Sequence, residues 1–304
     1  MKLGDTLLEE LWFSEGDPED LNDRAEGSAA AKIAAVSGLK PFPIVAQKAL
    51  QILSNPDFRL GEVTAVLEED PALASGVLRV ANSAFFAGAK SCASIAQAFV
   101  RMGGMAVKES ILSVAAMKMF PDTRGYGKLV RDHCAAVAAI VQALARDFAP
   151  EYTDGIFLCG LMHDVGKMLL IESGEFQYEA GRILMPDTDH VLEREALGYD
   201  HAVLGGYVMK SWKIPEPVPK LVAAHHQPAL AYEDKKLGVM TAILRIADRL
   251  ECALRNEPEN IMEFIETLED RPEMAYACID VEDIRLRMDK LYAVRLDSLR
   301  MFGG

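Results

Sequence analysis

The chain contains 304 residues, half of them hydrophobic and 26% charged, which is typical of a globular protein and excludes the fibrous, disulfide-scaffold and disordered classes. The formal net charge of −14 disfavours binding to nucleic acid and to anionic membrane surfaces, because both interactions depend on Lys and Arg. We therefore expect neither nucleic acid nor membrane among its partners.

Residues 1–40 have the pattern of an acidic helical extension. Residues 1–16 lack the basic start and the apolar centre of a signal peptide. No apolar run in the chain approaches the ~20 residues that cross a bilayer. The five cysteines are scattered and form no C-x-x-C pair, which is typical of small buried side chains in a reducing compartment. We expect a cytoplasmic protein.

Residues 41–120 form a first helical region. Helical periodicity dominates here and elsewhere, with no convincing alternating strand pattern, so we predict an all-α protein. Asp70 followed by Pro71 is a strong helix start, since Asp caps the first turn and Pro fits its first position. This helix is predicted to end at Asn82-Ser83. Gly103-Gly104 separates two further apolar-periodic segments.

Residues 121–255 form a second helical region, followed by charged helices over 256–304. Apolar periodicity predicts helices in the second region near 129–148, 155–172, 190–212, 216–226 and 238–254. Asp280 with Asp283 three positions later resembles the capping arrangement that opens a helix. We interpret Gly205-Gly206 as helix punctuation, because no strand or phosphate-loop spacing accompanies it.

The main functional signal is a set of histidines and aspartates in the second half of the chain. Imidazole is a common ligand of Zn, Fe, Ni and Cu, whereas carboxylate oxygens suit Mn and Mg. Two neighbouring ions can together activate water and neutralise a phosphoryl oxygen. The candidate metal ligands are His133, His163, Asp164, His201, His225, His226 and Asp248. His190 is the one histidine outside this set.

Taken singly, each histidine is better explained as a hydrogen-bonded core or surface residue. Asp164 differs, because a carboxylate inside the apolar helix that carries His163 is costly to bury unless it is paired or metal-bound. Lys167 shares a helix face with both residues. It could contact a substrate phosphate or form an ion pair with Asp164, and the sequence leaves the two roles open. For Arg245, one turn before Asp248, we favour a structural role.

The order of the candidate ligands resembles that of the HD-domain phosphohydrolases, particularly the HD-GYP branch. The segment His163-Asp-Val-Gly-Lys167 matches closely. In that branch the matching residues bind two or more metal ions, and the enzymes hydrolyse cyclic di-GMP. The resemblance implies a metal-dependent phosphohydrolase acting on a nucleotide or cyclic (di)nucleotide, with Asp164 bridging the metals and Lys167 stabilising developing negative charge.

The first region resembles an HDOD domain, the HD-related output domain of bacterial signalling proteins. Asp70-Pro-Ala-Leu and Ala81-Asn-Ser carry this likeness, which spans residues 41–255. It implies an HD-like helical bundle over 121–255 with an additional helical subdomain over 41–120. It also implies a regulatory role with protein signalling partners.

The sequence departs from the HD-GYP pattern at two points. No Gly-Tyr-Pro motif follows His226, and Leu129 stands where some members supply a glutamate for a third metal. We therefore predict a signal-transduction module that retains a dinuclear divalent-metal centre. The alternatives are an active phosphohydrolase and, third, a small-ligand or redox sensor. The ligand set accepts Fe, Mn, Zn, Ni or Mg and does not select among them.

Overall fold

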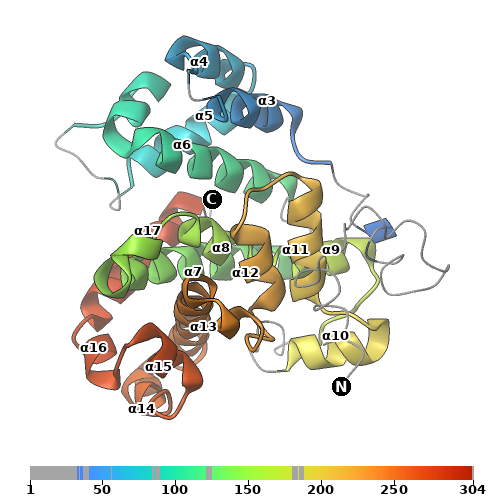
Figure 1. The fold of residues 1–304 in the computed structure, drawn as a ribbon, viewed down its shortest axis with the longest axis vertical. Coiled ribbons are helices and arrows are strands. Elements are labelled where there is room, and N and C mark those ends of the chain that lie inside the picture. Colours follow the sequence, from blue (N-terminus) through green and yellow to red (C-terminus); the bar gives the residue numbers. More distant parts are fainter. Residues whose placement is uncertain are drawn as a thin grey trace.

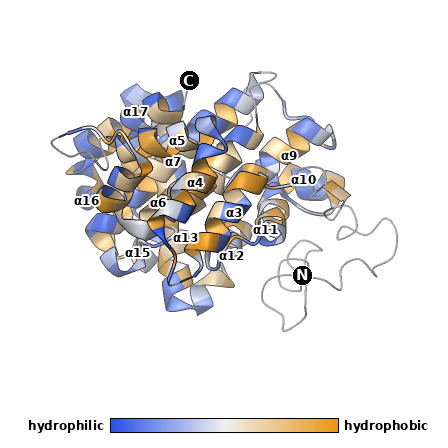
Figure 2. Ribbon diagram, turned by 90° about the horizontal axis from the view of Figure 1, so that it is seen from above, coloured by the Kyte–Doolittle hydropathy of each residue, from blue (hydrophilic) through white to orange (hydrophobic). Residues whose placement is uncertain are grey.

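The computed structural model describes residues 33, 35–36, 41–55, 57–83, 86, 90–120, 125–179, 184 and 188–302. All regular structure in these ranges is helical (Figure 1), which confirms the all-α prediction. Among these helices, none is long and apolar enough to span a membrane. The helices carry hydrophilic and hydrophobic stretches side by side (Figure 2), as expected where each helix buries one face.

The predicted extension over residues 1–40 lies outside the described residues, apart from 33 and 35–36. Ile33 and Val36 are buried and belong to the main hydrophobic core. At least this part of the extension is therefore packed against the protein.

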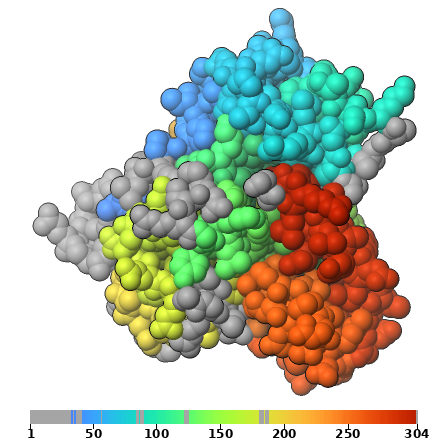
Figure 3. Space-filling model, turned by 180° about the vertical axis from the view of Figure 1, so that it is seen from behind, coloured from blue at the N-terminus to red at the C-terminus, as the bar shows by residue number. Residues whose placement is uncertain are grey.

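The first helices along the chain form an N-terminal lobe, which lies at the top of Figure 1 and forms the upper part of the molecule in Figure 3. Its helices are α3 (Ile44–Leu53), α4 (Leu60–Glu68), α5 (Pro71–Ala81) and α6 (Ile95–Met119). As predicted, Asp70 caps α5, and its side chain accepts hydrogen bonds from the backbone of Ala72 and Leu73 at 3.1 and 3.0 Å. Gly103 interrupts α6 with a φ of 80°, a conformation that favours glycine.

The remaining helices form a bundle around α7. They are α7 (Tyr126–Phe148), α8 (Ile156–Met162), α9 (Val165–Ser173), α10 (Asp189–Leu197), α11 (His201–Ser211), α12 (Val218–Ala224), α13 (Lys235–Asn256), α14 (Ile261–Glu266), α15 (Pro272–Ala277), α16 (Val281–Arg285) and α17 (Met288–Phe302). Every residue from His133 to Ala145 of α7 is buried, because α8, α13 and α17 all pack against it. The predicted capping box at Asp280 and Asp283 is present at the start of α16.

Two helices that the periodicity predicted as continuous are each divided in two. The predicted helix 155–172 is interrupted at His163 and Asp164. Helix α8 ends just before His163, and α9 begins just after Asp164. Consecutive residues of a continuous helix point in different directions, so the break allows both side chains to face one centre. The predicted helix 190–212 breaks after α10, where Gly198 has a φ of 87°. Asp200 then caps α11 by accepting from Val203 N at 2.9 Å.

The interpretation of Gly205-Gly206 as punctuation is wrong, because both residues lie inside α11. Gly205 allows close packing, because a Cβ on it would lie 3.0 Å from Val165 Cγ1 and 3.3 Å from Gly166 N. A Cβ on Gly166 would overlap the backbone carbonyl of His201. These glycines therefore let α9 and α11 approach closely, which brings His201 to the start of α9.

The expectation that cysteines are buried holds for four of the five. Cys92, Cys134, Cys159 and Cys252 are buried free thiols, and Cys278 is exposed. Cys278 follows α15 in the left-handed backbone region, with a φ of 52°.

Candidate metal centre

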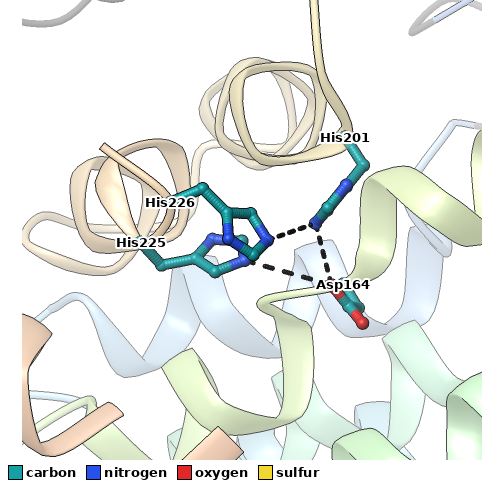
Figure 4. A group of neighbouring side chains, drawn as sticks. All are labelled: Asp164, His201, His225 and His226. Atoms are coloured by element: carbon teal, nitrogen blue, oxygen red, sulfur yellow. Dashed lines mark hydrogen bonds and ion pairs between the residues drawn. The ribbon is translucent and has the colours of Figure 1, made fainter. Parts of the chain in front are cut away.

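All seven predicted ligands converge at the centre of the bundle. They form two groups, and within each group one potential ligand atom per residue lies within 4.8 Å of all the others. The first group is Asp164, His201, His225 and His226, which point toward one another in Figure 4. The second group is His133, His163 and Asp248.

The helix ends supply most of these side chains. His201 is the first residue of α11, and His225 immediately follows α12. Asp248 and His133 come instead from the interiors of the two long helices α13 and α7. Because α7 contacts both α8 and α13, the buried surface of α7 brings the second group together.

In the second group, the Nε2 atom of His133 faces the centre. It lies 3.1 Å from Asp248 Oδ1 and 3.2 Å from His163 Nε2. The opposite ring nitrogen, Nδ1, contacts the buried carboxylate of Glu251. His163 has the same orientation, with Nδ1 bonded to the Gly160 carbonyl at 2.8 Å.

The first group repeats this arrangement. His201 Nε2 lies 3.0 Å from Asp164 Oδ1 and 3.0 Å from His226 Nε2, while its Nδ1 lies 2.7 Å from Glu193 Oε2. His225 Nδ1 lies 2.7 Å from the Val222 carbonyl. A carboxylate or carbonyl behind the outer ring nitrogen, with the inner nitrogen turned inward, is the usual arrangement around metal-binding histidines.

One inward nitrogen has no protein partner, which fits the binding of a cation. Within the described residues, His225 Nε2 is buried without a hydrogen bond. The two oxygens of Asp164 have no well-directed hydrogen bond either, but each has an ion-pair contact, one with Lys167 and one with His201. A buried polar nitrogen left without a partner is costly, and a cation at the centre would compensate His225 Nε2. The donor set of imidazoles and carboxylates therefore fits one or more divalent metal ions.

Burial sets the charge of three of the histidines. It lowers the pKa of His163 and lowers the pKa of His225 and His226 well below the usual value, so all three are neutral near pH 7. Neutral imidazole is the form that binds metals. The carboxylates beside His163 only partly offset the effect of burial.

The other two histidines are each paired with carboxylates. Burial alone would lower the pKa of His133, but Glu251 and Asp248 raise it to about 9. Glu193 and Asp164 likewise outweigh burial at His201 and raise its pKa to about 10. A metal ion binding at Nε2 would have to displace that proton, so metal binding would release protons.

Lys167 is buried in ion pairs. Its Nζ lies 3.1 Å from Asp164 Oδ2 and 3.1 Å from Asp189 Oδ2. Burial would lower the pKa of Lys167, but the surrounding carboxylates raise it above its ordinary value, so the lysine is charged. This is the ion pair that the sequence left open as one of two roles. Arg245 bonds Glu273 Oε1 at 2.5 Å and also contacts the His225 carbonyl.

Sequence reasoning missed four residues of this site. Glu251 and Glu193 hold the outer nitrogens of His133 and His201. Asp189 pairs with Lys167, and the His190 ring stacks on His226 with centroids 4.3 Å apart. Glu251 could have been found, since it lies three positions after Asp248 on one helix face. Asp189, His190 and Glu193 lie on α10, which reaches the site only through tertiary packing. No local sequence pattern indicates that α10 lies there.

The helical fold and the buried His/Asp cluster together define a protein of the HD-related type. The family model of the HDOD domain matches residues 39–228, and the chain belongs to this family. The matched segment includes every candidate ligand except Asp248.

Solved structures show the same fold. An HDOD domain protein of unknown function from Geobacter sulfurreducens is 20% identical with a TM-score of 0.70, over 90% of this chain and 96% of that one. A protein from Shewanella amazonensis SB2B, named as a candidate phosphohydrolase, is 22% identical with a TM-score of 0.69, over 91% and 99%.

A curated relative is similar over a shorter span. An uncharacterised protein of Treponema pallidum (strain Nichols) is 28% identical over 212 residues, or 66% of this chain. The matched segment covers 40% of the length of that protein.

Proposed function

We propose that this protein is a signal-transduction module of the HDOD family whose core holds a dinuclear metal centre. Asp164 supports the count of two ions, because it belongs to the first ligand group and also faces the second. Its Oδ2 lies 3.6 Å from His163 Nε2 and 3.8 Å from His133 Nε2. One ion would be held by each group, with the Asp164 carboxylate between them.

The burial of the centre is the observation that favours regulation over catalysis. Six of the seven candidate ligands are at most 8% exposed, and His226 is partly exposed. A catalytic metal site keeps an open position for water and substrate, whereas a closed site supports structure. A closed centre that joins six helices is suited to hold the bundle in one conformation for a partner protein to recognise.

Lys167 supports the same conclusion. A phosphohydrolase would use a cation to neutralise charge on the phosphoryl group. The ammonium group of Lys167 is instead engaged by Asp164 and Asp189 and is 2% exposed. Releasing it to a substrate would leave buried carboxylates without a counter-ion.

A signalling role also agrees with one structural relative. A candidate signal transduction protein from Marinobacter aquaeolei VT8 is 19% identical with a TM-score of 0.64, over 95% of this chain and 66% of that one. This is analogy at the level of the fold, and we give it less weight than the burial of the site. We propose that the partner is a signalling protein.

The second candidate function is hydrolysis of a nucleotide or cyclic dinucleotide phosphate. Its support is the full ligand set, in which Asp164 and His225 keep inward atoms free of hydrogen bonds. Metal ions bound there would supply an activated water and would polarise the phosphoryl group. In this case Asp164 would be a catalytic residue as well as a ligand, and Lys167 would orient it through their ion pair.

The metal content of the purified protein tests the shared part of the proposal. Wild type, Asp164→Ala and the control Asp289→Ala are prepared without chelator and compared by elemental analysis. Asp289 is exposed in the first turn of α17 and contacts none of the ligands. We expect about two equivalents in wild type and control and a large loss in Asp164→Ala. No metal in any sample, even after incubation with Mn²⁺ or Fe²⁺, would refute a metal centre.

Activity then separates the two functions. The metal-loaded protein is assayed with bis(p-nitrophenyl) phosphate and with cyclic di-GMP. We expect no turnover above that of Asp164→Ala, as a regulatory module requires. Turnover that is present in wild type and Asp289→Ala but absent in Asp164→Ala would overturn the regulatory proposal and support hydrolysis.

A further inference from the structure

A cavity of about 220 Å³ lies between the N-terminal lobe and the bundle, away from the metal centre. It is lined by residues of α5, α6, α7 and α8 and of the turn that precedes α8. Val80, Met102 and Phe157 provide apolar walls. None of its lining residues is a candidate metal ligand.

Two carboxylates face this cavity. Glu109 on α6 accepts a hydrogen bond from Gly155 N at 2.7 Å through one oxygen. Asp154 lies beside it and is close enough to raise its pKa further. In the described part of the chain, neither carboxylate forms an ion pair with Lys, Arg or His.

Arg146 does not neutralise these acids, although it lines the same cavity. Burial lowers the pKa of its guanidinium group, and neither carboxylate offsets this effect. Largely because of burial, and despite the bond from Gly155, the pKa of Glu109 is raised to about 7. The cavity therefore carries an excess of negative charge above that pH.

Gln142 is a second, independent sign of a ligand. Its side chain on α7 lines the cavity and is only 6% exposed, yet it forms no hydrogen bond within the described residues. The amide atoms of Gln142 are not sealed in the core but are open to the cavity that the residue lines, so a ligand bound there can supply the partner that the protein does not. Its carbonyl oxygen is an acceptor for the same kind of donor that would neutralise Glu109.

We propose that this cavity binds a small organic cation, a primary amine with an apolar stem. The ammonium group would donate to the free oxygen of Glu109 and to the amide oxygen of Gln142, with Asp154 adding attraction at longer range. The stem would lie against Met102 and Phe157. The stem of such an amine would contact the apolar walls, and its ammonium group would neutralise the negative charge. A bare metal ion would bind the carboxylates but make no contact with the apolar walls.

The proposal is independent of the metal centre and is tested with n-butylamine as the probe and n-butanol as its neutral analogue. Binding is measured by isothermal titration calorimetry at pH 8, where Glu109 is ionised and the amine is protonated. We expect n-butylamine to bind the wild-type protein and to raise its melting temperature, and n-butanol to do neither.

Two variants and a control locate the site. Glu109→Gln keeps an acceptor for Gly155 N but removes the charge, and we expect it to weaken binding by about tenfold or more. Gln142→Leu removes the other acceptor without touching Glu109, so it keeps the test valid if the first variant is unstable. Glu233→Gln, an exposed acid at a different surface groove, should bind n-butylamine as the wild type does.

Three results would overturn the proposal. The first is no measurable n-butylamine binding to the wild type. The second is equal binding of n-butanol, which would make the cavity an apolar void. The third is unchanged affinity in Glu109→Gln or, should that variant not fold, in Gln142→Leu, which would place the amine elsewhere.

Discussion

The half-buried carboxyl of Glu109 makes the stability of the protein depend on pH in a predictable direction. Burial is the main cause that raises its pKa from 4.5 to about 7, Asp154 adds to the rise, and the bond from Gly155 opposes it. The folded protein therefore binds a proton more tightly than the unfolded chain between these two values. Stability falls as pH rises through this window and is constant with respect to this group above it.

The size of the effect follows from the shift. The difference between 4.5 and about 7 is about 2.5 pKa units, and at 1.36 kcal/mol per unit the upper bound is about 3 kcal/mol. Glu109 is partly exposed to the cavity, so solvent will reduce this value. We expect about 1–3 kcal/mol between pH 5 and pH 8.

The test is urea unfolding of wild type, Glu109→Gln and the control Glu233→Gln at intervals from pH 5 to pH 8. Glutamine cannot ionise, so Glu109→Gln should gain stability relative to wild type as pH rises through this range. The charged groups that share the cavity, Asp154 and Arg146, are present in all three proteins and cancel in the comparison. A difference between Glu109→Gln and wild type that stays flat across the range would refute this reasoning.

Three further predictions concern packing, ligand support and capping. Gly166→Ala should lose about 1–3 kcal/mol of stability, because the new Cβ overlaps the His201 carbonyl. The control Gly61→Ala, which has no atom near its Cβ, should lose none. Thermal unfolding of both variants will test this. Glu193→Gln should bind metal about tenfold more weakly in a chelator competition, and unchanged affinity would mean that the carboxylate behind His201 does not support metal binding. Asp70→Ala should lower the free energy of unfolding by about 1–2 kcal/mol, because it removes the α5 cap. Urea unfolding measures this, and a change near zero would contradict the capping role.

The sequence was sufficient to predict the helical class and to select seven side chains that the fold brings together. Apolar periodicity sets the extent of α7 and α13, and Asp70 and Asp280 cap the helices they were expected to cap. The convergence of these candidate ligands was predictable only from their number and order. Any one of them, such as His201, has the local pattern of an ordinary core residue.

The breaks in the helices and the outer carboxylates could not be read from the sequence. Apolar residues continue on both sides of His163-Asp164, so periodicity does not show that the helix stops there. Glu193 lies on a polar helix and owes its role to α10 packing beside His201. Gly205 shows a related ambiguity, because a glycine signals helix termination and close helix packing equally well.

The short helix α8 has a consequence for how the two halves of the protein influence each other. The residue before its first turn, Gly155, donates a hydrogen bond to Glu109 of α6, and its last residue is followed by His163. Seven residues span only about 10 Å and behave as a stiff rod. A tilt of α6 that carried α8 with it would move His163 relative to His133, which lies on α7, and would change the spacing between these two candidate ligands. Helix α8 is therefore a direct structural link between the N-terminal lobe and the His/Asp cluster.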